Sequence, residues 1–303
     1  MKNKILNLLN KEVLNSEFTS IEIEGNNLLF INKFNVLDSD EKKYAAKDAN
    51  YSLLNKIGTG SMIDIYDWTH LFRYFIVAGL VKESGMNILD IGCASGVIRR
   101  ILRRGNRIAN FNYVGLDINK NMLKKIALDS GKHPAALLCV DLSKNWNYLQ
   151  NNKFDFVIAM EIIEHLRFEQ GLKFLKRCRM KMKDSGVLVF STPQYGFKKL
   201  SERTKNKLKF NDGKDYYVHH LHEYTREELE VLFEEVGLEI HSYYGYGTQI
   251  SVFEENIKNK FEFNYVYKKI SKFVPKPMII PLLSYANPEF ATFVLYILRK
   301  VVK

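Results

Sequence analysis

Strand-like and helix-like segments alternate along the chain from Asn87 onward, and this alternation constrains the fold more than any other feature of the sequence. The short apolar runs typical of buried strands cover residues 87–91, 112–116, 135–140, 154–159 and 186–191. The amphipathic stretches between them, typical of helices, cover 97–104, 119–130 and 166–182. This order predicts an α/β fold with a parallel, doubly wound sheet and helices on both of its faces.

The flanking segments extend this core. A helix is expected over 65–81, a capping box at Thr225–Glu228 opens another helix that ends near Gly237, and strands are expected over 238–243 and 293–298. Alternating residues near Ile21 and an apolar run at 28–31 predict an N-terminal hairpin. We expect four parts: an N-terminal arm or small subdomain (1–60), the core (61–245), an inserted cap (246–289) and a last core strand (290–303).

The run from Asn87 to Gly96 ends the first core strand in an acid and a turn of small residues. Glycines in such a turn let the backbone approach a ligand closely, and the helix that follows offers unpaired N–H groups. A Gly-x-x-x-Gly turn alone fits any nucleotide site or a purely structural turn. The residues that follow must decide between these interpretations.

Four acidic residues end four successive strands. In doubly wound folds, ligands bind outside the carboxyl ends of the strands, and an acid after the second strand accepts hydrogen bonds from ribose hydroxyls. Each acid alone would also serve as a helix N-cap, but four in register favour one ligand crevice. These acids are Asp90, Asp117, Asp141 and Glu161.

The ILDIGCASG run and these strand ends resemble the class I S-adenosylmethionine-dependent methyltransferases over roughly residues 65–245, with Ala94 where the commonest motif has glycine. The expected fold is then a Rossmann-like, mostly parallel sheet of seven strands whose last strand is antiparallel. The resemblance implies S-adenosylmethionine (SAM) as cofactor. The cofactor-binding residues that it implies are Arg73, for the cofactor carboxylate, and Asp90, Gly92, Ala94, Gly96, Asp117, Ile118, Asp141, Leu142 and Met160. The turn has few groups that could bind a diphosphate, which argues against NAD(P) as the cofactor.

The segment Glu161-Ile162-Ile163-Glu164-His165 is the strongest candidate for the catalytic site. On a helix, Glu161, Glu164 and His165 would share one face. Glu-x-x-Glu-His with a later histidine resembles ubiquinone-biosynthesis O-methyltransferases and small-RNA 2′-O-methyltransferases. This resemblance implies a divalent ion (Mg²⁺, Mn²⁺ or Zn²⁺) held by these three residues and His220. A metal-free role for Glu161 and His165, with His165 as general base, and a purely structural role are the alternatives.

The basic residues cluster outside the expected core. The net charge is +11, with seven Lys and Arg against two acids over 197–214 and nine against two over 257–303. A solvated face is one interpretation, and contact with an acidic substrate or nucleic acid is another. The aromatic residues among the lysines of 246–289 suit either bases or planar rings stacked beside phosphates or an apolar core with solvated lysines. The segment Phe273–Pro281 also suits a membrane surface, although its prolines interrupt the amphipathic pattern. Three cysteines without paired spacing, no signal-like N-terminus and no spanning run of apolar residues predict a cytoplasmic protein.

Together these features predict a SAM-dependent methyltransferase that O-methylates a small or medium-sized metabolite, with Glu161 and His165 as base or metal ligands. The segments 1–60, 197–217 and 246–289 are expected to frame the acceptor. Two alternatives stay open: a nucleic-acid methyltransferase, acting on RNA 2′-oxygens or on bases, and a binding protein that keeps the fold without turnover. The sequence carries no expectation about oligomeric state.

Overall fold

The computed structural model describes residues 2–23, 27–33, 65–104, 110–128, 135–144, 146–193, 224–247 and 293–301, together with isolated positions 269, 272–274, 279, 284–285, 288 and 291. The expected boundary at 58–61, the basic loop 197–217 and nearly all of the expected cap lie outside these residues.

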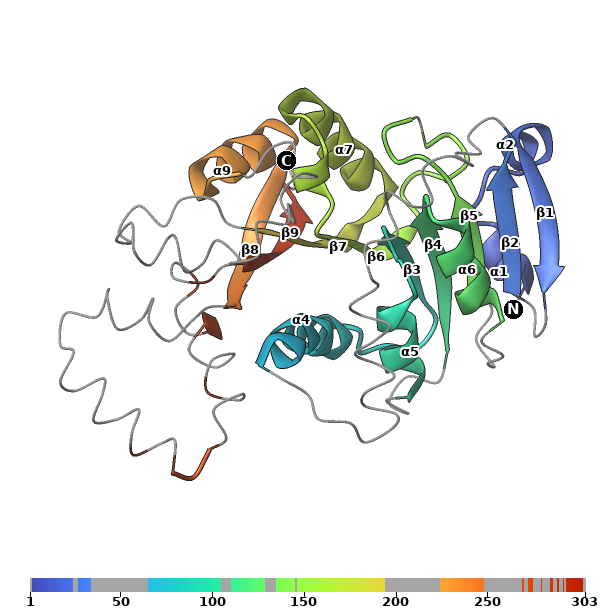
Figure 1. The fold of residues 1–303 in the computed structure, drawn as a ribbon. Helices are drawn as coiled ribbons and strands as arrows, with labels where there is room; N and C mark the ends of the chain where they lie inside the picture. The colour runs from blue at the N-terminus through green and yellow to red at the C-terminus, as the bar shows by residue number, and fades with distance from the viewer. Residues whose placement is uncertain are drawn as a thin grey trace, which may run out of the picture.

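The core is one sheet whose strands run in the order β1-β2-β5-β4-β3-β6-β7-β9-β8 (Figure 1). Strands β2 to β7 pair in parallel, and β9 lies antiparallel between β7 and β8. The predicted doubly wound, mostly parallel sheet and its antiparallel last strand are confirmed. The strands are β1 (Phe18–Ile23), β2 (Asn27–Asn32), β3 (Met86–Ile91), β4 (Phe111–Asp117), β5 (Ala135–Cys139), β6 (Phe154–Met160), β7 (Met182–Pro193), β8 (Leu238–Tyr246) and β9 (Phe293–Lys300).

The sheet has nine strands where seven were expected, because the N-terminal hairpin joins it. β1 pairs antiparallel with β2, and β2 pairs in parallel with β5. The apolar side chains of β2 are buried, so this strand covers an otherwise open edge of the core sheet. Asn27 at its start is fully buried. Its side-chain N–H donates to the Ala127 carbonyl, and its oxygen accepts from the backbone N–H of Ala135 and from Arg99.

The helices cover both faces of the sheet and bury two apolar clusters. One cluster lies against α4 (Ile65–Leu80), α5 (Val97–Arg104) and α6 (Lys120–Ala127). The other lies against α1 (Lys2–Leu6), α2 (Lys11–Glu17), α7 (Phe168–Lys181) and α9 (Arg226–Glu235). The predicted capping box is confirmed, because Thr225 and Glu228 bond reciprocally at the start of α9. No helix in the described part of the chain has the length and apolar character needed to cross a membrane.

The helix expected over 166–182 begins two residues later, at Phe168, and a short 3₁₀ helix, η2 (Ile163–His165), precedes it. The parallel strands end at a common edge: Ile91 of β3 pairs with Ala159 of β6 and with Leu116 of β4. The turns after these strands therefore adjoin one another, and the predicted site residues lie in or beside them.

Candidate active site

The turn after β3 brings its backbone close to the neighbouring segments. Gly92, Ala94 and Gly96 all have positive φ angles, of 66°, 44° and 71°. A side chain at Gly92 would overlap the Cδ1 atom of Ile162, in the segment that follows β6. Ala94 adopts a left-handed conformation that costs an L-residue about 1 kcal/mol or more. The close approach of Ile162 explains why residue 92 is glycine. Ala94 is strained at the position where the commonest form of the motif has glycine.

Asp117 and Asp141, which follow β4 and β5, use part of their acceptor capacity within the protein. The two carboxylate oxygens of Asp117 accept from the backbone N–H groups of Ala94 and Asn119, both at 2.8 Å. One oxygen of Asp141 accepts from the Ser143 N–H at 2.8 Å. A carboxylate offers about four lone pairs. These bonds use two of the lone pairs of Asp117 and one of those of Asp141.

Three apolar residues of the predicted site lie at the same edge. Ile118 follows β4, and its carbonyl accepts from the Cys139 thiol. The Leu142 carbonyl accepts from the Trp146 indole N–H. Met160 is the last residue of β6 and is half-buried against the cluster that α4, α5 and α6 cover.

Asp90 lies inside the protein, whereas all four strand-end acids were predicted to face one crevice. It is 5% exposed, and its carboxylate accepts from the Tyr113 hydroxyl at 2.6 Å. Burial raises the pKa of Asp90 to about 7, and the nearby Asp117 carboxylate adds to this effect. Asp90 supports the turn from within.

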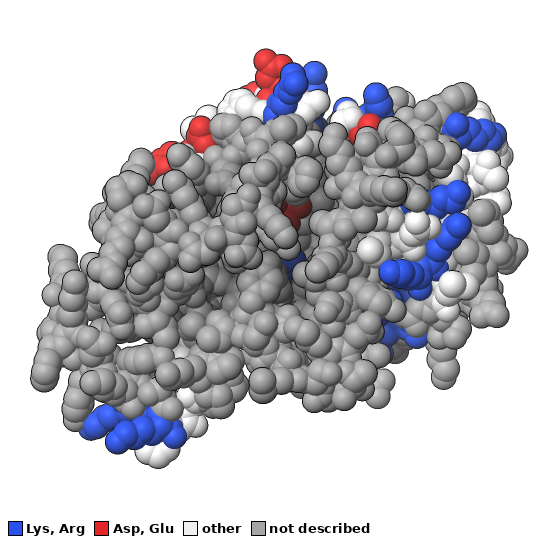
Figure 2. Space-filling model, viewed as in Figure 1, with Lys and Arg blue, Asp and Glu red and all other residues white. Residues whose placement is uncertain are grey.

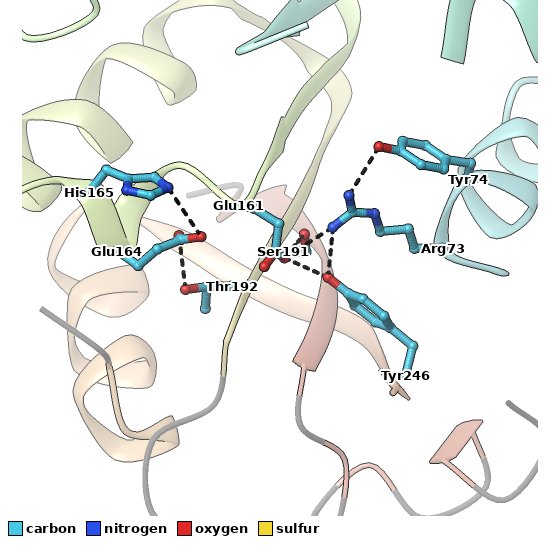
Figure 3. A network of polar contacts seen from close by, with 8 residues as sticks. All are labelled: Arg73, Tyr74, Glu161, Glu164, His165, Ser191, Thr192 and Tyr246. Carbon is cyan, nitrogen blue, oxygen red and sulfur yellow. Dashed lines mark hydrogen bonds and ion pairs between the residues drawn. The ribbon is translucent and has the colours of Figure 1, made fainter. Parts of the chain in front are cut away.

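Glu161 is the centre of a second polar network, built by four elements. Figure 2 shows this face of the molecule hollowed at its middle, with acidic and basic atoms visible in the hollow. Glu161 has a positive φ of 55°, and its Oε1 atom accepts from the hydroxyls of Ser191 on β7 and Tyr246 on β8. The same oxygen lies 3.4 Å from Arg73 of α4 (Figure 3). Three donors thus converge on one carboxylate oxygen, and no described residue bonds to Oε2.

Arg73 is held by this network on the α4 side. Its guanidinium is buried, bonds to the hydroxyls of Tyr246 at 3.3 Å and Tyr74 at 3.0 Å, and lies over the Tyr74 ring. Its Nε atom is buried and has no hydrogen-bond partner among the residues that the structure describes. The structure therefore gives Arg73 a protein carboxylate, Glu161, as its ionic partner. One buried N–H group is left for a further acceptor such as a ligand carboxylate.

The expectation that Glu161, Glu164 and His165 share a helical face is wrong. Only residues 163–165 form a helix, a single 3₁₀ turn, and Glu161 precedes it in a left-handed conformation. Glu164 is 1% exposed and accepts from the Thr192 hydroxyl at 3.2 Å. Burial, with the neighbouring Glu161 charge, raises its pKa well above the usual range. His165 is 45% exposed, with Nε2 4.0 Å from Glu164 Oε1 (Figure 3).

The metal site is not assembled by the described residues. Among them, no group of three or more His, Cys, Asp and Glu side chains could hold a metal ion. Glu161 Oε1 is occupied by three donors, and Glu164 is buried against Thr192, so these residues do not fit a shared ion. His220, the fourth expected ligand, lies outside the described residues.

Tyr246, Ser191, Tyr74 and Tyr113 are site residues that the sequence did not indicate. Tyr246 ends β8 and Ser191 lies in β7, but neither position belongs to a spaced motif. Tyr246 lies 173 residues from Arg73 and 85 residues from Glu161 along the chain. No local pattern links residues at such separations.

The fold and the site together define a class of protein. Three features are typical of a Rossmann-like SAM-dependent methyltransferase. They are the parallel strand order β5-β4-β3-β6-β7 with antiparallel β9 beyond it, the glycine turn after β3, and the acids after β4 and β5. The chain belongs to the methyltransferase family whose model, described as a methyltransferase domain, matches residues 65–243.

Curated relatives with similar sequences include two ubiquinone biosynthesis O-methyltransferases. The protein of Bradyrhizobium diazoefficiens is 31% identical over 110 residues, which cover 36% of this chain and 40% of that protein. The protein of Haemophilus ducreyi is 29% identical over 113 residues, 36% of this chain and 45% of that protein. The match thus spans less than half of each relative. A SAM-dependent methyltransferase structure from Archaeoglobus fulgidus is similar with a TM-score of 0.49 and 18% identity. The similarity covers 82% of this chain and 99% of that chain.

Proposed function

We propose that this methyltransferase acts on a hydroxyl oxygen of a small or medium-sized metabolite, such as a quinone precursor, a sugar or a secondary metabolite. The observation that carries the proposal is the position of His165. It lies 45% exposed, in the segment that leaves β6 and packs through Ile162 against the Gly92 turn. An imidazole beside the donor site is suited to take a proton from an attacking hydroxyl near neutral pH. The names of the two relatives, both O-methyltransferases, support an oxygen acceptor.

The residues proposed to hold SAM fit it by their donor and acceptor chemistry. Asp117, at the end of β4, is proposed to accept from the two ribose hydroxyls, and Asp141, after β5, from the adenine amino group. The buried Arg73 Nε–H is a donor for the cofactor carboxylate. When bound, SAM supplies a methyl group that its positively charged sulfur already activates. The remaining residues proposed to line the cofactor are Gly92, Ala94, Gly96, Ile118, Leu142 and Met160, and the buried Asp90 is proposed to support the turn from within.

Glu161 and His165 have different proposed tasks. Glu161 is fixed through Oε1, so its Oε2 atom accepts a hydrogen bond from the acceptor and orients it. His165 accepts the proton of the attacking hydroxyl. Placing the nucleophile in line with the methyl carbon supplies most of the rate in such a reaction, and the base supplies less. We propose that the site works without a metal ion, and the contacts of Glu161 and Glu164 with Ser191, Tyr246 and Thr192 support this.

The test uses labelled methyl transfer from SAM into a metabolite extract, and separately into RNA and DNA. We expect His165→Gln to lower kcat by about 10²-fold or more, within the usual range for general bases, without changing SAM affinity measured by calorimetry. His241→Gln is the matched control, because His241 is exposed on β8. Equal activity of the two variants would refute the role of His165.

Two further outcomes test the rest of the proposal. Loss of activity on chelation, restored by Mg²⁺, Mn²⁺ or Zn²⁺, would refute the metal-free site. Label found in nucleic acid alone, with a rate that falls steeply as salt rises, would replace the metabolite acceptor with a nucleic acid. Label found in a metabolite, in a methyl ether by mass spectrometry, would support the proposal.

A further inference from the structure

Phe273 is 87% exposed, more than any other large hydrophobic side chain in the described part of the chain. The other exposed large hydrophobic residues there range from 41% to 62%. Burial of an exposed aromatic ring is favourable, but a single exposed hydrophobic side chain is common on protein surfaces and does not by itself mark a contact. The residues beside Phe273 therefore decide whether it belongs to a contact site.

Two lysines lie on the same turn as Phe273. The backbone N–H of Lys272 donates to the Lys269 carbonyl at 3.3 Å, and both lysine side chains are exposed. Figure 1 draws the described residues of this segment in orange at the lower left, away from the sheet. Figure 2 shows Lys and Arg side chains gathered at that same corner. We call Lys269, Lys272 and Phe273 the basic turn.

The sequence around the basic turn has the same character. Residues 258–276 contain six lysines and one acid, Glu262, with five aromatic residues among them. The apolar run Met278–Leu283 follows directly. Lysines beside aromatic and aliphatic residues form the composition of segments that lie in the interface of an anionic bilayer.

A bilayer suits this site better than a nucleic acid does. Single-stranded nucleic acids bind in basic grooves, where successive bases stack on aromatic platforms. The basic turn instead presents one ring and two ammonium groups from a corner of the molecule. A ring of this kind enters the headgroup region while the lysines meet the lipid phosphates. We propose that the basic turn is a peripheral membrane contact, with an anionic lipid surface as its partner.

The charge part of this proposal is tested by cosedimentation of the full chain with vesicles. We expect binding to phosphatidylglycerol–phosphatidylcholine vesicles, weakened by salt, and little binding to phosphatidylcholine alone. K269E/K272E should weaken binding by about 25-fold or more, at about fivefold for each lysine lost. K124E/K125E, on the exposed face of α6, is the matched control because it changes the net charge equally. Equal losses in the two double variants would refute a specific site.

The aromatic part is tested by Phe273→Ala, which we expect to weaken binding about tenfold, as partial burial of one ring would. Phe273→Trp should retain binding. Phe75→Ala, at a position 51% exposed on α4, is the control for loss of an exposed ring. The proposal is overturned if the wild-type chain does not bind anionic vesicles, or if Phe273→Ala binds as well as Phe75→Ala. Neither result depends on methyl transfer.

Discussion

Asp90 makes the stability of this protein depend on pH in an unusual direction. Asp90 is 5% exposed, and its carboxylate accepts a hydrogen bond from the Tyr113 hydroxyl. Burial and the Asp117 charge raise its pKa from 3.8 to about 7, against the opposing effect of Tyr113. The perturbation to test is Asp90→Asn, which keeps the shape and an oxygen that can accept from Tyr113 but cannot ionise.

The sign and the size follow from the two pKa values. The unfolded chain loses the Asp90 proton near pH 3.8 and the folded chain near pH 7, so between them the folded state binds more protons. The contribution of Asp90 to stability therefore falls as pH rises through this window and is constant above it. Each pKa unit corresponds to about 1.4 kcal/mol, so the ionised residue costs about 4 kcal/mol above pH 7.

The assay is urea unfolding of the ligand-free protein and of Asp90→Asn at several pH values. We expect the stability gained by Asp90→Asn to be about 3 kcal/mol larger at about pH 8 than at about pH 5. Asp184→Asn is the control, because the Asp184 side chain is 81% exposed and keeps its hydration on folding. A gain from Asp90→Asn that does not change between these pH values would refute the assignment of a buried, protonated carboxyl.

Three other substitutions test the turn, the added sheet edge and the Glu161 network. Gly92→Ala should lower stability by about 1–3 kcal/mol and weaken SAM binding, because the new Cβ overlaps Ile162 at a positive φ; an unchanged thermal midpoint would contradict this. Asn27→Ala should lower the free energy of unfolding in urea by about 2–4 kcal/mol, since it leaves three buried groups without their hydrogen-bond partner. A decrease below about 0.5 kcal/mol would show that the edge strand is held by apolar contacts alone. Tyr246→Phe should lower kcat about tenfold, with the fold retained by circular dichroism, because Glu161 loses one of the donors that orient it; steady-state kinetics equal to wild type would exclude that role.

The core sheet was predictable because its signals are local. A buried parallel strand is a short apolar run, and an amphipathic helix repeats its apolar residues every three or four positions. The predicted strand at 87–91 and helix at 97–104 match β3 and α5 to within one residue. The capping box at Thr225 is equally local, since its two partners are three residues apart.

The join between the N-terminal hairpin and the sheet was not predictable from the same signals. The hairpin itself is local and was expected, but its pairing with β5 joins residues more than a hundred positions apart. Edge pairing depends on which strand of the finished sheet lies exposed. Asn27 shows the consequence, because its three partners come from α5, α6 and β5.

The sequence by itself determined the class of fold, the turn at Gly92–Gly96 and the cofactor, because those features depend on residue order within one strand–turn–helix unit and on acids at successive strand ends. Only the tertiary structure decided that Asp90 is buried, that Glu161 lies outside the helix of Glu164 and His165, and that Arg73, Ser191 and Tyr246 converge on one Glu161 oxygen. The physical reason is separation along the chain. A hydrogen bond between Arg73 and Tyr246 exists only after α4 and β8 have packed against each other.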